Sequence, residues 1–167
     1  MAGSVSERRA WLRDRVERRD ALLAPGAANA LTARVIQAQG FEACYVTGAG
    51  IANTHLGAPD IGLVTLSEVA ATVAAIAEIS TLPLIVDIDT GFGNVLNTQR
   101  TVRMLERAGA AALQIEDQVF PKKCGHFAGK AVIPVEEMCG KVRAAVDARV
   151  DGNLMIIART DARAIDG

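Results

Sequence analysis

The sequence has few aromatic residues, few cysteines and no long hydrophobic run. Aromatic residues make up 4% of its 167 positions, whereas hydrophobic residues make up 50%. This composition excludes an intrinsically disordered chain and is typical of a packed α/β protein. No apolar run approaches the roughly 18 residues that a membrane-spanning helix needs, so no membrane partner is expected.

Cysteine and net charge are equally sparse. Cys44, Cys124 and Cys139 are odd in number and widely spaced, which argues against a disulfide framework or a zinc ribbon and favours a reduced, cytoplasmic setting. A net charge of −1 gives no reason to expect a nucleic-acid partner. Residues 1–20 are expected to form an N-terminal helical segment, solvated because its charges are mixed, and its acidic residues argue against a targeting peptide.

From Leu22 onward, short apolar runs alternate with helix-like stretches. The pattern predicts strands over 21–24, 43–47, 84–89, 111–115 and 154–158, and helices over 29–39, 65–79, 97–107 and from 134. A long Gly-rich loop is expected between 47 and 65. Regular alternation indicates a parallel sheet with right-handed crossovers, either an open doubly wound sheet or a (β/α)8 barrel. Both architectures bind their ligand at the carboxyl ends of the strands.

Carboxylates lie at these strand ends. Asp87 and Asp89 have the period-2 spacing that places both side chains on one side of a strand. Two ionised carboxylates this close repel each other unless a cation or donors offset their charge, and oxygen ligands suit Mg²⁺ (or Mn²⁺). A salt-bridged or helix-capping Asp is the competing interpretation. Glu116, at the end of the next strand, favours a metal site.

Two loops carry further candidates. Gly48-Ala49-Gly50 nearly matches the dinucleotide-binding fingerprint, but the third glycine is missing and no helix is expected to follow, so a dinucleotide site is disfavoured. Its backbone N–H groups can bind a substrate carboxylate, or its glycines can simply serve a turn.

The second loop follows the fourth predicted strand and contains Lys122, Lys123, Cys124 and His126. Long loops usually work or move, and nearby lysines lower the pKa of a thiol. A solvated lysine pair and a small buried cysteine are the competing interpretations. For His126, a hydrogen-bonding role is favoured over metal ligation.

These motifs together resemble the isocitrate lyase/phosphoenolpyruvate mutase superfamily. The resemblance runs from about Leu22 to the end and is closest to the methylisocitrate lyase and dimethylmalate lyase branch, often labelled carboxyphosphonoenolpyruvate phosphonomutase. The motifs that carry it are Tyr45-Val46-Thr47-Gly48, Leu56-Gly57-Ala58-Pro59-Asp60, Val86-Asp87-Ile88-Asp89-Thr90-Gly91-Phe92-Gly93, Ile115-Glu116-Asp117-Gln118, Lys122-Lys123-Cys124-Gly125-His126 and Ala158-Arg159-Thr160-Asp161. Ala49 departs from the Gly that the methylisocitrate branch tends to have.

The resemblance implies a (β/α)8 barrel that binds Mg²⁺ at its C-terminal face and assembles into homo-oligomers, tetramers in the family. Roles follow by matching: metal for Asp87, Asp89 and Glu116, an acid beside the metal for Asp60, and substrate binding for Tyr45, Thr47, Gly48 and Arg159. The segment from Lys122 to His126 matches a mobile gating loop, in which Lys122, Cys124 and His126 are the candidate catalytic residues. In the lyase branch, the residue that matches Cys124 protonates the leaving enolate.

The function implied is Mg²⁺-dependent cleavage of a carbon–carbon bond in a 2-hydroxy di- or tricarboxylate by retro-aldol chemistry. Phosphonate-forming mutases and oxaloacetate-type decarboxylases, which generally lack the cysteine, are the alternatives. An eight-stranded barrel takes roughly 250 residues, so a single partial barrel domain over 1–167, truncated after about five strands, is expected. Such a domain would be weakly active and prone to associate through an unpaired edge, or would be an inactive interaction module.

Overall fold

Five parallel strands form one sheet in which each strand pairs with the next one along the chain. The computed structural model describes residues 3–125 and 127–165. The strands run in the order β1 (Gly26–Ala27), β2 (Cys44–Val46), β3 (Leu84–Asp87), β4 (Ala112–Glu116) and β5 (Met155–Arg159). A doubly wound sheet reverses its strand order at a switch point, whereas a barrel does not. The sequential order therefore identifies a barrel-type sheet.

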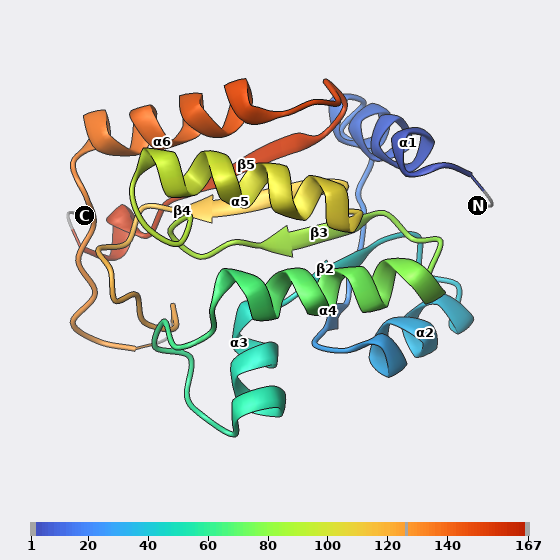
Figure 1. Ribbon diagram of the computed structural model, residues 1–167, viewed down its shortest axis with the longest axis horizontal. Coiled ribbons are helices and arrows are strands. Elements are labelled where there is room, and N and C mark those ends of the chain that lie inside the picture. The colour runs from blue at the N-terminus through green and yellow to red at the C-terminus, as the bar shows by residue number, and fades with distance from the viewer. Residues whose placement is uncertain (1–2, 126, 166–167) are drawn as a thin grey trace.

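Helices cover one face of this sheet, namely α2 (Ala30–Ala38), α4 (Leu66–Ile79), α5 (Val95–Ala108) and α6 (Val135–Ala148). Helix α1 (Val5–Glu17) packs instead with side chains of the opposite face. Figure 1 shows α4, α5 and α6 side by side along the sheet, with the strand arrows pointing to the edge where the loop after β4 lies. Across residues 3–125 and 127–165, no helix combines the length and the apolar character that crossing a bilayer requires.

Capping residues that can be recognised in the sequence determine where the helices begin and end. Thr65 and Glu68 form the predicted capping box, because each side chain accepts a hydrogen bond from the other's backbone N–H at the start of α4. Gly109, with φ of +110°, ends α5 in the left-handed conformation that glycine adopts most readily. The predicted helices at 29–39, 65–79, 97–107 and from 134 are confirmed to within two residues at each end that was specified.

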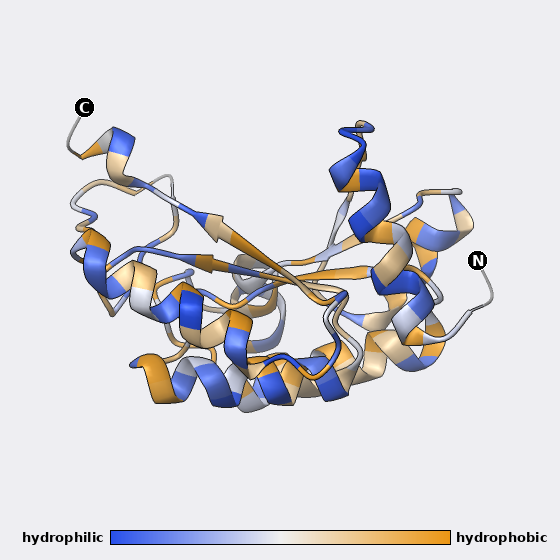
Figure 2. Ribbon diagram, turned by 90° about the horizontal axis from the view of Figure 1, so that it is seen from above, coloured by the Kyte–Doolittle hydropathy of each residue, from blue (hydrophilic) through white to orange (hydrophobic). Residues whose placement is uncertain are grey.

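The main core lies between the sheet and the helices. Val46, Leu84, Val86, Leu113 and Ile115 are fully buried. These side chains explain why the third and fourth strands read as continuous apolar runs. In Figure 2 the strands are largely orange, whereas the helices carry blue residues on their outer surfaces. Val135, the first residue of α6, is 73% exposed and lies outside this core.

Helix α1 is solvated over most of its surface, as its mixed charges predicted, but two of its side chains are buried. Leu12 is fully buried and packs with Ala111 and Ala112 in a second, smaller apolar cluster. Arg9 is also buried, and its guanidinium donates to the carbonyl oxygens of Ala110 and Glu106 at 2.9 and 2.7 Å. The charged composition hid these two inward-facing side chains, because a guanidinium fully supplied with acceptors can be buried.

Two segments also depart from the predicted secondary structure. The first strand lies at Gly26–Ala27 instead of 21–24. The expected Gly-rich loop after β2 contains a short α-helix, α3 (Gly48–Ile51), which continues into a π-helical turn over Ala52–Leu56. A cap explains this helix, since the Thr47 hydroxyl oxygen accepts a hydrogen bond from the Gly50 N–H at 3.2 Å.

Candidate active site

The carboxyl ends of β3, β4 and β5 bring acidic and basic side chains together. Asp87 is the last residue of β3, and Glu116 and Arg159 are the paired last residues of β4 and β5. The Arg159 Nη1 atom lies 3.4 Å from Glu116 Oε2. Parallel pairing thus delivers to one edge the residues that the sequence placed at successive strand ends.

The two aspartates do not lie on one strand, as their spacing predicted. The strand ends at Asp87, and Asp89 follows in a turn with φ of +48°. The turn is held by hydrogen bonds from the Asp89 N–H to Asp87 Oδ1 at 3.1 Å and from the Glu116 N–H to the Asp89 carbonyl at 2.8 Å. Its left-handed backbone is uncommon for a residue with a side chain, so these contacts fix a strained conformation.

Gly48 lies against both carboxylates. A Cβ atom at this position would lie 3.3 Å from Asp87 Oδ2 and 3.3 Å from Asp89 Oδ1. The missing side chain therefore lets the two carboxylates converge beside the start of α3. Gly48 thus provides space for the two carboxylates. The sequence predicted only that its backbone N–H binds a substrate carboxylate.

Lys122 occupies the centre of the acidic cluster. Its Nζ lies 2.6 Å from Asp60 Oδ1 and 2.7 Å from Asp89 Oδ1, and its side chain is 4% exposed. The alternative of a solvated lysine pair is therefore wrong for Lys122, although Lys123 is exposed. Burial alone would lower the pKa of Lys122, but the charges of Asp89 and Asp60 outweigh it and raise that pKa above its ordinary value.

Two carboxyl groups of the cluster have raised pKa values. Burial raises the pKa of Glu116 to about 7; Arg159 and Lys122 oppose the shift, and Asp87 and Asp89 add to it. Burial also raises the pKa of Asp89, the Asp87 charge adds to this effect, and Lys122 opposes it. Burial is thus the main cause of both raised pKa values, and the neighbouring charges modify it.

The loop after β4 is fastened over this cluster. The Cys124 N–H donates to the Asp60 carbonyl at 2.9 Å, and the Gln118 side chain both donates to and accepts from the Lys123 backbone. A Cβ at Gly125 would lie 2.6 Å from Arg159 Nη2. The Cys124 backbone is therefore bonded to Asp60, and the next residue, Gly125, lies against Arg159. Cys124 is half-buried, and none of the three cysteines forms a disulfide. His126 lies outside the described residues.

Tyr45 joins the cluster from β2, whereas Thr47 does not. The Gln114 amide donates to the Tyr45 hydroxyl at 2.8 Å, and burial together with the Asp87 charge raises the pKa of Tyr45. The Thr47 hydroxyl is instead used as the cap of α3. Of the two matched positions, only Tyr45 thus has a contact with the other site residues.

The sequence-based interpretation assigned no role to three polar residues that organise the site. Gln114 positions Tyr45, Gln118 clamps the loop, and Asp161 accepts from Arg159 Nη2 at 3.2 Å and from Gln118 Nε2 at 2.9 Å. A usable signal was present for two of them. Gln114 is two residues before Glu116 on the same strand, and Asp161 is two residues after Arg159.

The donor set fits a divalent cation in its chemistry. The described part of the chain contains no three Asp, Glu, His or Cys side chains that could hold a metal ion as they are arranged, and the Lys122 ammonium lies between the carboxylates instead. Yet Glu116 Oε1 is buried without a hydrogen-bond partner, and Gly48 leaves space beside Asp87 and Asp89. Carboxylate oxygens are the ligands that Mg²⁺ prefers.

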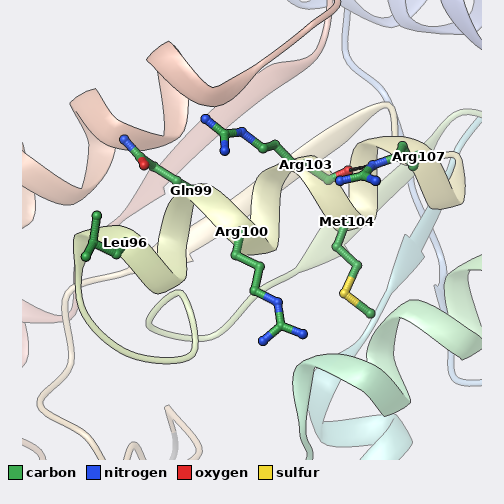
Figure 3. A pocket seen from close by; sticks show the side chains of 6 residues that line it. All are labelled: Leu96, Gln99, Arg100, Arg103, Met104 and Arg107. Atoms are coloured by element: carbon green, nitrogen blue, oxygen red, sulfur yellow. Dashed lines mark hydrogen bonds between the residues drawn. The ribbon is translucent and has the colours of Figure 1, made fainter.

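A separate hollow lies on the outer side of α5. It has a volume of about 390 Å³ and is lined by Leu96, Gln99, Arg100, Arg103, Met104 and Arg107 (Figure 3). The three arginine residues are exposed on the helix, as solvated side chains commonly are. The hollow contains none of the strand-end residues, so it is not part of the candidate active site.

The raised pKa of Glu116 predicts a pH dependence of stability. A carboxyl whose pKa is higher in the folded than in the unfolded protein stabilises the fold fully below its unfolded pKa, near 4.5, and this contribution is lost as the pH rises through about 7. In the absence of divalent cations, we expect the contribution of Glu116 to the free energy of unfolding to fall by up to about 3 kcal/mol between pH 4.5 and 8. Urea denaturation at several pH values measures it, and Glu116→Gln should flatten the dependence; an unchanged slope in that variant would contradict the assignment.

The fold and the site define a barrel-type protein with an acidic cluster beneath a cysteine-bearing loop. The chain belongs to the phosphoenolpyruvate phosphomutase family, whose sequence profile matches residues 12–166. It is 51% identical over 158 residues to 2,3-dimethylmalate lyase of Eubacterium barkeri, covering 95% of this chain and 55% of the relative. It is 54% identical over 156 residues to 2-methylisocitrate lyase of Aeropyrum pernix, covering 93% and 50%.

Solved structures agree with this family. A crystal structure of 2,3-dimethylmalate lyase, a PEP mutase/isocitrate lyase superfamily member, matches with a TM-score of 0.88 and 39% identity, over 97% of this chain and 54% of the other. Phosphonopyruvate hydrolase in complex with oxalate and Mg²⁺ matches with a TM-score of 0.84 and 32% identity, over 96% and 53%. The superfamily and the barrel-type α/β fold inferred from the sequence are therefore confirmed. The chain spans about half the length of the relatives it matches.

Proposed function

We propose that this chain supplies the catalytic half of a carbon–carbon lyase that cleaves 2-hydroxy di- or tricarboxylates of the methylisocitrate or dimethylmalate type. The observation that carries the proposal is the loop with Cys124, whose backbone N–H is bonded to Asp60 and whose Lys122 lies within the acidic cluster. Both curated relatives quoted above are named as lyases of this kind. A thiol beside an anion-rich, cation-binding centre suits the protonation of a carbanion-like product.

The proposed cation is Mg²⁺ or Mn²⁺, held by Asp87, Asp89 and Glu116 with Asp60 beside them. Support comes from the unpartnered Glu116 Oε1 and from the similar phosphonopyruvate hydrolase, whose structure was solved in complex with oxalate and Mg²⁺. When bound, the cation would hold the α-oxygens of the substrate and stabilise charge that develops on them. A cation bound at Asp89 Oδ1 would displace Lys122, because the Lys122 Nζ lies 2.7 Å from that oxygen.

The protein side chains then account for the remaining steps. Arg159, which lies beside Glu116 and Asp161, is placed to pair with a substrate carboxylate, and Tyr45 borders the same space. A base, either a carboxylate of the cluster or a water molecule, takes the substrate's hydroxyl proton. The adjacent carbon–carbon bond then breaks, so that a keto acid forms and the bond's electron pair remains on the departing enolate. Cys124 donates its thiol proton to the enolate carbon, and the thiolate regains a proton from solvent.

We further propose that residues 1–167 form a single partial barrel domain, that the protein is cytoplasmic, and that it forms homo-oligomers. The parallel sheet with sequential strand order supports the first proposal. The odd number of cysteines without a disulfide supports the reduced setting. Lys122 and His126 complete the proposed catalytic loop. In this role Lys122 acts as a cation that pairs with Asp60 once the metal occupies Asp89, because its raised pKa keeps it protonated.

Product analysis tests the proposed activity. A chain of the relatives' full length, supplied with Mg²⁺, should convert methylisocitrate to succinate and pyruvate, or dimethylmalate to propionate and pyruvate, as measured by NMR. Oxaloacetate and phosphonopyruvate serve as comparison substrates, and turnover on them should be at least about 10-fold slower, because both lack the 2-hydroxyl group and the alkyl substituents of the proposed substrates. Efficient turnover of only oxaloacetate or phosphonopyruvate would replace the lyase with a decarboxylase or a phosphonate enzyme.

A further inference from the structure

Lys141 is a buried lysine whose position none of the proposed catalytic roles requires. It lies in the middle of α6 and is 5% exposed. Its Nζ donates to the carbonyl oxygen of Thr90 at 3.2 Å, and the Glu137 carboxylate, 3.9 Å away, is half exposed. Burying an ammonium group costs free energy unless its partners offset that cost, and one neutral acceptor with one distant carboxylate offsets it poorly. The burial of this ammonium group therefore suggests a role for the segment to which it is hydrogen-bonded.

The acceptor belongs to the turn that carries Asp89. Four residues between 89 and 93 have positive φ: Asp89 at +48°, Gly91 at +88°, Phe92 at +59° and Gly93 at +140°. The four successive carbonyl oxygens of residues 88 to 91 accept hydrogen bonds from Gly91 N at 2.8 Å, Glu116 N at 2.8 Å, Lys141 Nζ at 3.2 Å and Thr101 Oγ1 at 3.1 Å, respectively. Lys141 supplies the one charged donor of these four.

We propose that Lys141 is a positioning residue, which holds the strained turn from its outer side so that Asp89 presents its carboxylate to the cation site. This inference rests on the proposed function, because Asp89 is one of the proposed metal ligands. A strained turn persists only where its surroundings over-determine it, and a hydrogen bond from a buried cation is stronger than one from a neutral group. Helix α6 also follows the Cys124 loop directly in the chain. The same helix is therefore connected to the Cys124 loop and, through Lys141, to the turn that carries Asp89.

The test compares three variants of the 167-residue chain. Lys141→Met keeps the apolar stem but removes the donor and the charge, Lys141→Arg keeps both, and Arg143→Met changes an exposed residue of the same helix. Calorimetric titration with Mn²⁺, well below each melting temperature, should show affinity about 10- to 100-fold weaker in Lys141→Met, the usual effect of losing a residue that orients a ligand. Lys141→Arg should recover most of the loss, and Arg143→Met should match the unmodified chain.

Hydrogen exchange gives a readout that needs no metal. The backbone amides of Gly91 and Glu116 should exchange faster in Lys141→Met, relative to amides of α4, because they donate within the turn. A role limited to general stability would lower the melting temperature without a selective change at these amides. If Lys141→Met does not fold, Lys141→Gln, which keeps a neutral donor, undergoes the same measurements with a smaller expected loss.

The outcomes separate the inference from the function on which it rests. If the unmodified chain binds no Mn²⁺ at the cluster, the proposed metal site is wrong, and the positioning role is overturned with it. If the chain binds Mn²⁺ and folded Lys141→Met binds it within twofold of the same affinity, the positioning role is wrong and the metal site stands. Weakened affinity, selective exchange at Gly91 and Glu116, and rescue by arginine together support the role.

Discussion

Replacing Cys124 with alanine is expected to lower kcat by about 10²- to 10⁴-fold, the usual contribution of a general acid, while divalent cation binding stays intact. The loop backbone should hold its place, because Cys124 is tied to Asp60 through its main-chain N–H. Cys124→Ser keeps a donor of similar size, but the higher pKa of a hydroxyl makes proton donation harder, so its kcat should also fall. The assay follows pyruvate release by a chain of the relatives' full length.

Cys139 provides the matched control for this experiment. It is an exposed cysteine on α6, so Cys139→Ala should retain wild-type turnover. A loss in kcat for Cys124→Ala, with an unchanged Kd for Mg²⁺, is the signature of a missing acid. Wild-type turnover of Cys124→Ala on every 2-hydroxy acid tested would refute the lyase proposal. A phosphonate-forming mutase, which protonates no enolate, would then be favoured.

Asp89→Asn is expected to weaken Mg²⁺ affinity by about 10²-fold or more and to abolish turnover. The substitution removes one anionic ligand of a cation that prefers carboxylate oxygens, and it leaves Lys122 with Asp60 alone. The side chain keeps its shape, so the turn should persist through the Glu116 N–H bond to the carbonyl of residue 89. Calorimetric titration compares the variant with the unmodified chain.

The control for this substitution is Asp147→Asn, an exposed aspartate on α6. This variant also loses one negative charge, but at a position outside the acidic cluster, so the Kd for Mg²⁺ should stay unchanged. Equal affinity in Asp89→Asn and the unmodified chain would show that the cation is bound elsewhere. Equal weakening in both variants would attribute the effect to net charge instead of to a ligand.

The sheet and its helices could be predicted because each depends on local patterns. Apolar runs such as 84–87 and 112–115 form strands, and the capping residues Thr65 and Gly109 begin and end helices where the sequence placed them. Besides the first strand, which lies at Gly26–Ala27 instead of 21–24, two local features were missed for physical reasons. The Thr47 hydroxyl starts a helix in a Gly-rich stretch, and the burial of Arg9 depends on carbonyl oxygens about a hundred residues away in the sequence.

The site was predictable as a list of residues but not as an arrangement. Strand ends in a parallel sheet meet at one edge, so Asp87, Glu116 and Arg159 could be grouped from spacing alone. The burial of Lys122 between Asp60 and Asp89 is a contact between two loops and leaves no periodic signal. The position of Asp89 was misjudged for a related reason, since its positive φ depends on hydrogen bonds from β4 and α6 to the turn.

The most direct test of the account is the location of Mn²⁺ in a crystal of this chain, determined by anomalous diffraction. We predict a peak among the carboxylates of Asp87, Asp89 and Glu116, bound directly at roughly 2.2 Å or through water, with Lys122 Nζ displaced from Asp89. Bound Mn²⁺ at another place, or an empty cluster at saturating Mn²⁺ with Lys122 still between Asp60 and Asp89, would contradict the proposed metal site.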